Sequence, residues 1–169
     1  MENKREIVEG LLRKYNISYN EYACKHCGKV PPGLLYTTDE GRDEISIEYD
    51  LLFSVFSQIR SGMGKPLYIT SGYRCPEHER KMFYEACKKE GTDNPKGKAF
   101  ISAHMFGLAL DIAADNVADQ TKIVELARNS HPKPRIGWQV YRAQGMYIVH
   151  IDFMPLVVPP IYDYYAEEW

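Results

Sequence analysis

The sequence predicts an α+β fold in which helices pack around a small, mainly antiparallel sheet. Several segments repeat apolar residues at helical spacing, and short apolar or alternating runs between them have the period of strands. No internal repeat or linker-like run divides the 169 residues. A chain of this length buries roughly two-thirds of its unfolded surface on folding. We therefore expect one domain over residues 1–169, with its core at about 44–155 and an N-terminal helix and a cysteine loop as additions.

The first half of the chain contributes two expected helices and one strand. Apolar residues at helical spacing predict a helix over residues 2–15. Residues 21–43 are polar, contain glycine and proline, and are expected to form a loop that carries a Cys-x-x-Cys motif. A continuous apolar face over residues 47–59 predicts a second helix, which the glycines and proline of residues 62–66 end. The run over residues 67–70 then has the composition of a short buried strand.

The middle of the chain predicts a helix, a surface loop and a strand. Pro76 suits the first turn of a helix over about residues 76–89. Residues 90–100 are polar and rich in glycine and proline, as expected of a loop. Residues 108–113 alternate between larger apolar residues on one face and Asp111 between two alanines on the other. A carboxylate between two small residues leaves room for a metal ion or ligand beside it.

The last part predicts a helix followed by a β-hairpin. Residues 118–129 carry an apolar stripe at helical spacing. Two strands are expected at 136–141 and 146–153, joined by a turn at 143–145. The segment after Pro155 contains more prolines and several tyrosines and is expected to be irregular.

Composition and charge exclude several classes of function. The net charge is −2 and the basic residues are scattered, so no surface that tracks nucleic-acid phosphates is expected. Apolar runs are too short for a membrane span, and the opening MENKREIVEG lacks the apolar core of a secretory signal. We therefore expect a monomer that is synthesised in the cytoplasm and has neither nucleic acid nor membrane as a partner.

The residues with the richest chemistry lie in SAHMFGLALD, at 102–111, and in VHID, at 149–152. His104, Asp111 and His150 provide two imidazoles and one carboxylate, a ligand set that suits Zn²⁺. Three protein ligands leave a fourth position for water, which distinguishes catalytic from structural zinc sites. Zinc lowers the pKa of a bound water towards ~7 and so favours hydrolysis.

The spacing of these residues allows their side chains to meet at one metal ion. Gly107 allows the chain to fold the turn with His104 back onto the strand with Asp111. His150 and Asp152 share one strand face, so Asp152 can reach a metal ion held by His150 and is a candidate base or outer partner. A single histidine in a hairpin is more often structural. The metal hypothesis therefore depends on the three residues together.

The patterns SGYR, SAHMFGLALD and VHID resemble the zinc D-Ala-D-Ala carboxypeptidase family, which includes phage L-alanyl-D-glutamate endolysins and shares its fold with the Hedgehog signalling domain. The resemblance covers about residues 67–154. It implies that His104, Asp111 and His150 are zinc ligands and that the substrate is a peptide of bacterial peptidoglycan.

The resemblance also suggests residues that act on the substrate. Arg74 of SGYR matches a family arginine that faces the substrate, where it could bind a carboxylate or an oxyanion. The alternative for Arg74 is a salt bridge at the start of a helix. Ser102 and Tyr147 are further candidates for substrate binding. Many family members carry an acidic base where this chain has Tyr147, so the base role is assigned to Asp152.

Two functional readings follow from these residues. The first is a zinc peptidase that cuts peptidoglycan, of D-Ala-D-Ala carboxypeptidase or L-Ala-D-Glu endopeptidase type, which acts on the wall after phage-type release. The alternative is a non-catalytic zinc-containing binding module of the same fold, such as a phage structural or wall-binding protein.

A Cys-x-x-Cys motif suggests a possible second metal. Cys24 and Cys27 supply half of a structural zinc site, with His26 between them, and the remaining cysteines are Cys75 and Cys87. The alternative is unpaired buried thiols. Metal stoichiometry separates the two.

Overall fold

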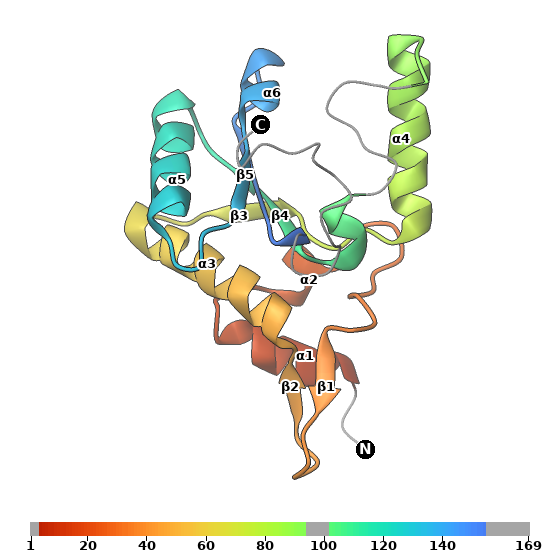
Figure 1. Ribbon diagram of the computed structural model, residues 1–169, viewed down its shortest axis with the longest axis vertical. Helices are drawn as coiled ribbons and strands as arrows, with labels where there is room; N and C mark the ends of the chain where they lie inside the picture. Colours follow the sequence, from red (N-terminus) through yellow and green to blue (C-terminus); the bar gives the residue numbers. More distant parts are fainter. Residues whose placement is uncertain (1–3, 94–101, 155–169) are drawn as a thin grey trace.

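The computed structural model describes residues 4–93 and 102–154. Its main feature is a four-stranded sheet in the order β3-β4-β6-β5 (Figure 1). All three pairings in this sheet are antiparallel. The predicted α+β class with a small antiparallel sheet is confirmed. The strands are β3 (Tyr68–Ser71), β4 (Ala109–Ala113), β5 (Arg135–Gly137) and β6 (Ile148–Asp152).

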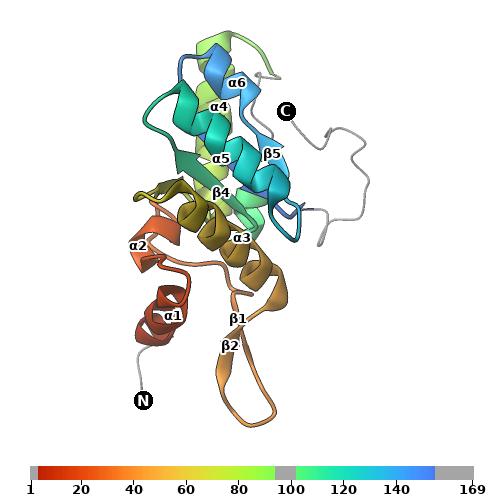
Figure 2. The same cartoon turned by 90° about the vertical axis from the view of Figure 1, so that its left-hand side faces the viewer.

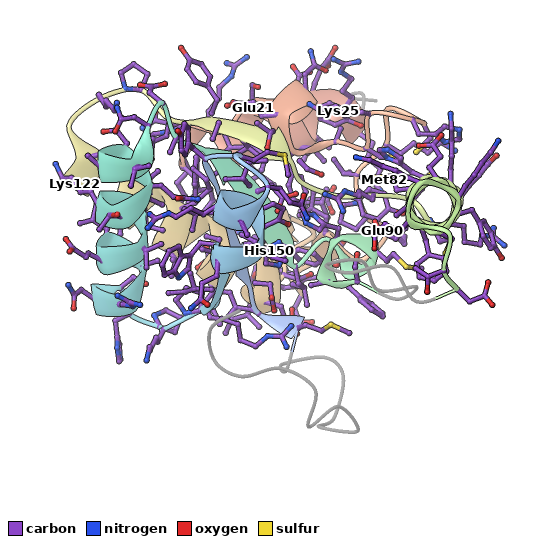
Figure 3. All side chains as sticks on the ribbon, turned by 90° about the horizontal axis from the view of Figure 1, so that it is seen from above. Glu21, Lys25, Met82, Glu90, Lys122 and His150 are labelled. Carbon is purple, nitrogen blue, oxygen red and sulfur yellow. The ribbon has the colours of Figure 1, made fainter. Side chains whose placement is uncertain are left out.

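Helices flank this sheet on opposite sides. Figures 1 and 3 show α5 on one side and α4 on the other. Helix α3 packs against α5, and the buried side chains of both helices belong to the same core cluster as those of the sheet. No helix in the described part of the chain has both the length and the apolar composition of a membrane span. The helices are α1 (Lys4–Arg13), α2 (Tyr19–Tyr22), α3 (Ile47–Met63), α4 (Pro76–Glu90), α5 (Val117–Asn129) and α6 (Gln139–Ala143), with a 3₁₀ turn η1 (Ala103–Phe106).

The apolar face predicted for α3 forms the centre of the core. Leu52, Phe56 and Ile59 have no exposed surface, and they belong to one cluster with Ile112 of β4 and Ile151 of β6. Burying each of these side chains contributes about 1.5–3 kcal/mol. Gly64, in the left-handed conformation, caps the helix where the sequence predicts its end. The core therefore holds the two central strands, which carry the candidate metal ligands, in a fixed position.

Two segments differ from the prediction. The hairpin expected at 136–141 and 146–153 is interrupted, because β5 ends at Gly137 and residues 139–143 form α6. The chain turns at Trp138, whose ring stacks under the Arg142 guanidinium at 4.4 Å and so favours the helical turn. The five residues of this helix are too few to distinguish a helical period from that of a strand, which explains the wrong prediction.

The second difference lies in the loop expected over residues 21–43. It contains the end of α2 and a hairpin of β1 (Leu35–Thr37) and β2 (Asp43–Ile45). Gly41 adopts a φ of 77° in the connecting turn. Figure 2 shows this hairpin and α1 at one end of the molecule, away from α6. Residues 94–100 of the loop predicted over 90–100, and the irregular segment predicted after Pro155, lie outside the described residues.

Gly107 connects η1 to β4 in a position that only glycine fits. Its φ is 73°, and an added Cβ would lie 2.5 Å from Pro31 Cγ and 2.6 Å from Tyr22 Oη. The Tyr22 hydroxyl donates a hydrogen bond of 2.7 Å to the Gly107 carbonyl. A side chain at this residue therefore meets both a backbone penalty and a packing penalty.

We expect Gly107→Ala to lower the free energy of unfolding by about 2–4 kcal/mol, combining left-handed strain with overpacking. Gly145→Ala is the matched control, because Gly145 has a φ of 72° but nothing within 4 Å of an added Cβ. This control should lose only about 1–2 kcal/mol. Urea unfolding of both variants measures the difference. Equal losses would show that contacts with Pro31 and Tyr22 do not matter.

Candidate metal centre

Three buried polar side chains from three separate elements meet at the middle of the sheet. His104 comes from η1, Asp111 from β4 and His150 from β6, with 2%, 5% and 5% of their surface exposed. One ligand atom from each lies within 4.8 Å of the other two. Figure 3 shows His150 between α5 and α4. The structure therefore brings together the three residues that the sequence predicts as a metal site.

Strand register places two of these residues side by side. Asp111 and His150 are direct partners across the β4–β6 pair, so their side chains emerge next to each other. The His104 ring reaches the same point because η1 folds back onto β4. Its Nδ1–H donates to the Gly72 carbonyl at 2.6 Å, which leaves Nε2 facing Asp111 Oδ1 at 3.3 Å.

Asp152 fixes the orientation of the His150 ring. Its Oδ2 lies 3.1 Å from His150 Nε2, while His150 Nδ1 lies 2.8 Å from Asp111 Oδ1. The other Asp152 oxygen accepts two hydrogen bonds from Arg135 and one from the Met154 backbone N–H. Both oxygens of Asp152 are therefore engaged. This geometry supports the role of outer partner, and the role of general base stays a prediction.

Arg74 contacts a candidate metal ligand directly. Its Nη2 donates to Asp111 Oδ2 at 2.6 Å, its Nη1 to Glu79 Oε2 at 3.3 Å and its Nε to Ser71 Oγ at 2.8 Å. Only 7% of Arg74 and 1% of Glu79 is exposed. The guanidinium thus bridges the two carboxylates. The salt bridge at the start of a helix, which the sequence offered as the alternative for Arg74, is therefore present, with Glu79 as its partner.

The electrostatics of the cluster favour a positive charge at its centre. Burial alone would lower the pKa of His150, but hydrogen bonds to Asp111 and Asp152 outweigh it and raise the pKa to about 9. Burial opposes ionisation of Asp111. The charges of His104 and His150, and their hydrogen bonds to Asp111, nevertheless hold its pKa well below the usual range. For His104, burial dominates and lowers the pKa. A metal ion would replace the His150 proton in this arrangement.

The donor atoms fit a zinc ion. Tetrahedral nitrogen and oxygen ligands, each about 2.0–2.2 Å from Zn²⁺, lie roughly 3.4 Å apart. The distance of 3.3 Å between His104 Nε2 and Asp111 Oδ1 matches this value. The 2.8 Å between His150 Nδ1 and Asp111 Oδ1 is a hydrogen bond, which would open by about 0.6 Å around such an ion.

Ser102 and Tyr147, the predicted substrate-binding residues, differ in their surroundings. Ser102 Oγ is buried and has no hydrogen-bond partner among the described residues, as suits a group that faces a ligand. Tyr147 directly precedes β6 and is 38% exposed. Among the described residues, no side-chain hydrogen bond joins it to His104, Asp111 or His150. Tyr141 was not predicted. Burial, followed by the charge of Asp111, raises its pKa.

Comparisons with known proteins add a distant likeness. No protein-family model matches the chain, and no curated protein matches it. Among solved structures, VanYB in complex with D-Alanine-D-Alanine is similar at 17% identity over 80% of this chain and 87% of that chain, with a TM-score of 0.42. A variant of the vancomycin resistance D,D-pentapeptidase VanY, in complex with Zn(II), is similar at 20% identity over 66% of this chain and 74% of that chain, with a TM-score of 0.37. These values are too low to assign the chain to a family.

Proposed function

We propose that the chain is a zinc-dependent peptidase that hydrolyses amide bonds in the peptides of bacterial peptidoglycan, of D-Ala-D-Ala carboxypeptidase or L-Ala-D-Glu endopeptidase type. The observation that carries the proposal is the convergence of His104, Asp111 and His150, buried and with their ligand atoms within 4.8 Å of one another. The substrate class rests on the resemblance of the SGYR, SAHMFGLALD and VHID motifs.

The ligand set is that of a catalytic centre. Two histidines and one carboxylate leave a fourth position open, and Asp152 binds the outer nitrogen of His150 instead of joining the ligand group. When bound, zinc supplies Lewis-acid chemistry, acidifying a water molecule and polarising a carbonyl group. Structural zinc sites usually have four protein ligands instead.

The surrounding residues hold the ligands in the required states. The Gly72 carbonyl and Asp152 fix the outer nitrogens of His104 and His150, so that the inner nitrogens face Asp111. Arg74 binds the second oxygen of Asp111 and keeps the carboxylate ionised and in place. The same guanidinium charge favours a substrate carboxylate or a developing oxyanion at the centre.

Two observations favour the alternative, a zinc-containing binding module without activity. Both oxygens of Asp152 are engaged, and Tyr147 stands where many relatives in the resembled family have an acidic base. Without a general base, hydrolysis would be slower by about 10²–10⁴-fold.

Digestion of purified peptidoglycan tests the proposal. We expect the zinc-loaded protein to release fragments whose masses correspond to cleavage within the peptide stems, and we expect a chelator to stop the release. Adding Zn²⁺ back to the chelated protein should restore it, which controls for unfolding. Mass analysis of the fragments identifies the bond. Peptidoglycan that binds to the metal-loaded protein and stays uncut would contradict the peptidase and support the binding module.

A further inference from the structure

A second group of metal-binding side chains lies outside the candidate active centre. The sulfur atoms of Cys24, Cys27 and Cys75 all lie within 4.8 Å of one another. The Nδ1 atom of His78 lies 3.4 Å from the Cys24 sulfur. The sequence suggests only the Cys24 and Cys27 half of such a site. The fold adds Cys75 and His78, which are about fifty residues away in the chain.

The backbone around Cys24 and Cys27 forms a tight turn that presents both sulfurs on one side. The Cys24 N–H donates to the Lys29 carbonyl, and the Gly28 N–H donates to the Cys24 carbonyl, both at 2.8 Å. Gly28 has a φ of 68°, a conformation that glycine adopts readily. Such a turn orders the Cys-x-x-Cys pair independently of the rest of the cluster.

The other two residues come from the start of α4. Cys75 is the N-cap of this helix, and His78 lies in its first turn. Three-residue spacing on a helix puts both side chains on one face. Two rigid pieces of backbone, a glycine turn and a helix start, thus supply two candidate ligands each.

The three sulfurs form one close group, and the distance from His78 to one of them fits a tetrahedral site. Sulfur and nitrogen ligands at about 2.3 and 2.0–2.1 Å from Zn²⁺ lie roughly 3.5 Å apart. The Cys24 Sγ to His78 Nδ1 distance of 3.4 Å agrees with this value. The Cys75 backbone N–H also points at the Cys24 sulfur, at an N to S distance of 3.3 Å. Backbone N–H groups directed at a sulfur stabilise its anionic form.

The crowding of the three sulfurs also favours a bound cation. Three sulfurs this close resist becoming anions together unless a cation lies between them.

We propose that Cys24, Cys27, Cys75 and His78 bind a structural Zn²⁺ ion, separate from the proposed catalytic ion. Four protein ligands of the Cys₃His type close the coordination sphere, as in structural sites. His26 also lies near, with its Nδ1 3.5 Å from the Cys75 sulfur, but it is exposed, whereas His78 is partly buried and held by α4. We therefore assign His78 as the fourth ligand.

This site would connect the loop after α2 to the segment that carries Arg74. The Tyr73 N–H donates to the Tyr22 carbonyl at 2.8 Å, and the Arg74 N–H donates to the His104 carbonyl at 3.0 Å. Cys75 follows directly. A metal ion at Cys75 would thus fix the backbone from which Arg74 reaches Asp111.

Metal content per chain tests the proposal without an activity assay. Elemental analysis of the protein saturated with zinc and then desalted should give two equivalents. Cys27→Ser and His78→Ala should each reduce the zinc content to one equivalent. Cys87→Ser is the control and should retain two, because Cys87 lies outside the group of three sulfurs. His150→Ala should also give one, through loss of the other ion. The two losses are distinguished by cobalt substitution, since only the cysteine site gives thiolate-to-cobalt charge-transfer absorption.

Several outcomes would overturn the proposal. One zinc equivalent in the parent chain, with no thiolate absorption after cobalt substitution, excludes the site even if a variant fails to fold. A disulfide between two of the three cysteines, detected by mass analysis under non-reducing conditions in metal-saturated protein, also excludes it. Retention of two equivalents by His78→Ala together with loss by His26→Ala overturns the assignment of the fourth ligand. A parent chain with a single zinc equivalent that gives thiolate absorption after cobalt substitution would count against the proposed peptidase and support the cysteine site.

Discussion

His150→Ala should remove the metal ion from the candidate active centre and lower peptidoglycan hydrolysis by about 10³-fold or more, because a catalytic metal contributes several kcal/mol to the transition state. His150 supplies one of only three ligand groups found at this centre in the described residues. Metal titration and initial rates of fragment release measure the two effects. Retained zinc affinity at the His104 and Asp111 centre with unchanged rates would contradict the assignment.

Asp152→Asn provides a graded comparison that separates its two candidate roles. As the partner of His150 Nε2, Asp152 should contribute about 10–100-fold to metal affinity, and the variant should lose that amount. As a general base, it should leave metal affinity unchanged and lower the rate at saturating zinc by about 10²–10⁴-fold. Asp115→Asn is the control, because its carboxylate is 78% exposed.

Arg74→Met should give the largest loss of stability among single substitutions at the centre, about 3–5 kcal/mol. It leaves the buried carboxylate of Glu79 without its cation, and it removes the partner of Asp111 Oδ2. Urea unfolding of the metal-free protein measures the loss. Arg42→Met is the matched control, since the Arg42 side chain is 70% exposed in its ion pair with Glu40. This control should change stability by less than about 0.5 kcal/mol.

A second substitution shows whether the loss comes from the buried charge. Arg74→Met combined with Glu79→Met removes both partners, so the double variant should regain part of the stability lost by Arg74→Met alone. If the double variant is less stable than the single one, the packing around Arg74 matters more than the unpaired carboxylate, and the prediction is wrong.

The long elements of the fold could be predicted from the sequence because their patterns extend over several turns. The helices at 47–59, 76–89 and 118–129 appear within a few residues of their expected positions as α3, α4 and α5. Short segments were predicted less accurately. Helix α6 has only five residues, too few to show a period, and the packing of Arg142 on Trp138 decides its conformation.

The candidate ligands could be predicted because spacing and strand parity constrain them. Asp111 and His150 lie on strands whose alternation already shows which face they occupy. Glu79 could not be found this way, because its contact with Arg74 depends on how the first turn of α4 lies relative to the Arg74 side chain. Cys75 could not be joined to Cys24 for the same reason. Contacts between distant segments require the tertiary structure.

The four residues from Gly72 to Cys75 touch both groups of candidate ligands. The Gly72 carbonyl binds the His104 ring, and Cys75 contributes its sulfur to the cysteine group. An ion bound at either end would restrict this short stretch and thereby alter how tightly the other end holds its own ion. Binding free energies are reciprocal, so zinc at the cysteine group would change the affinity of the histidine group for zinc by the same factor as the reverse. Loading of one ion would then depend on the other.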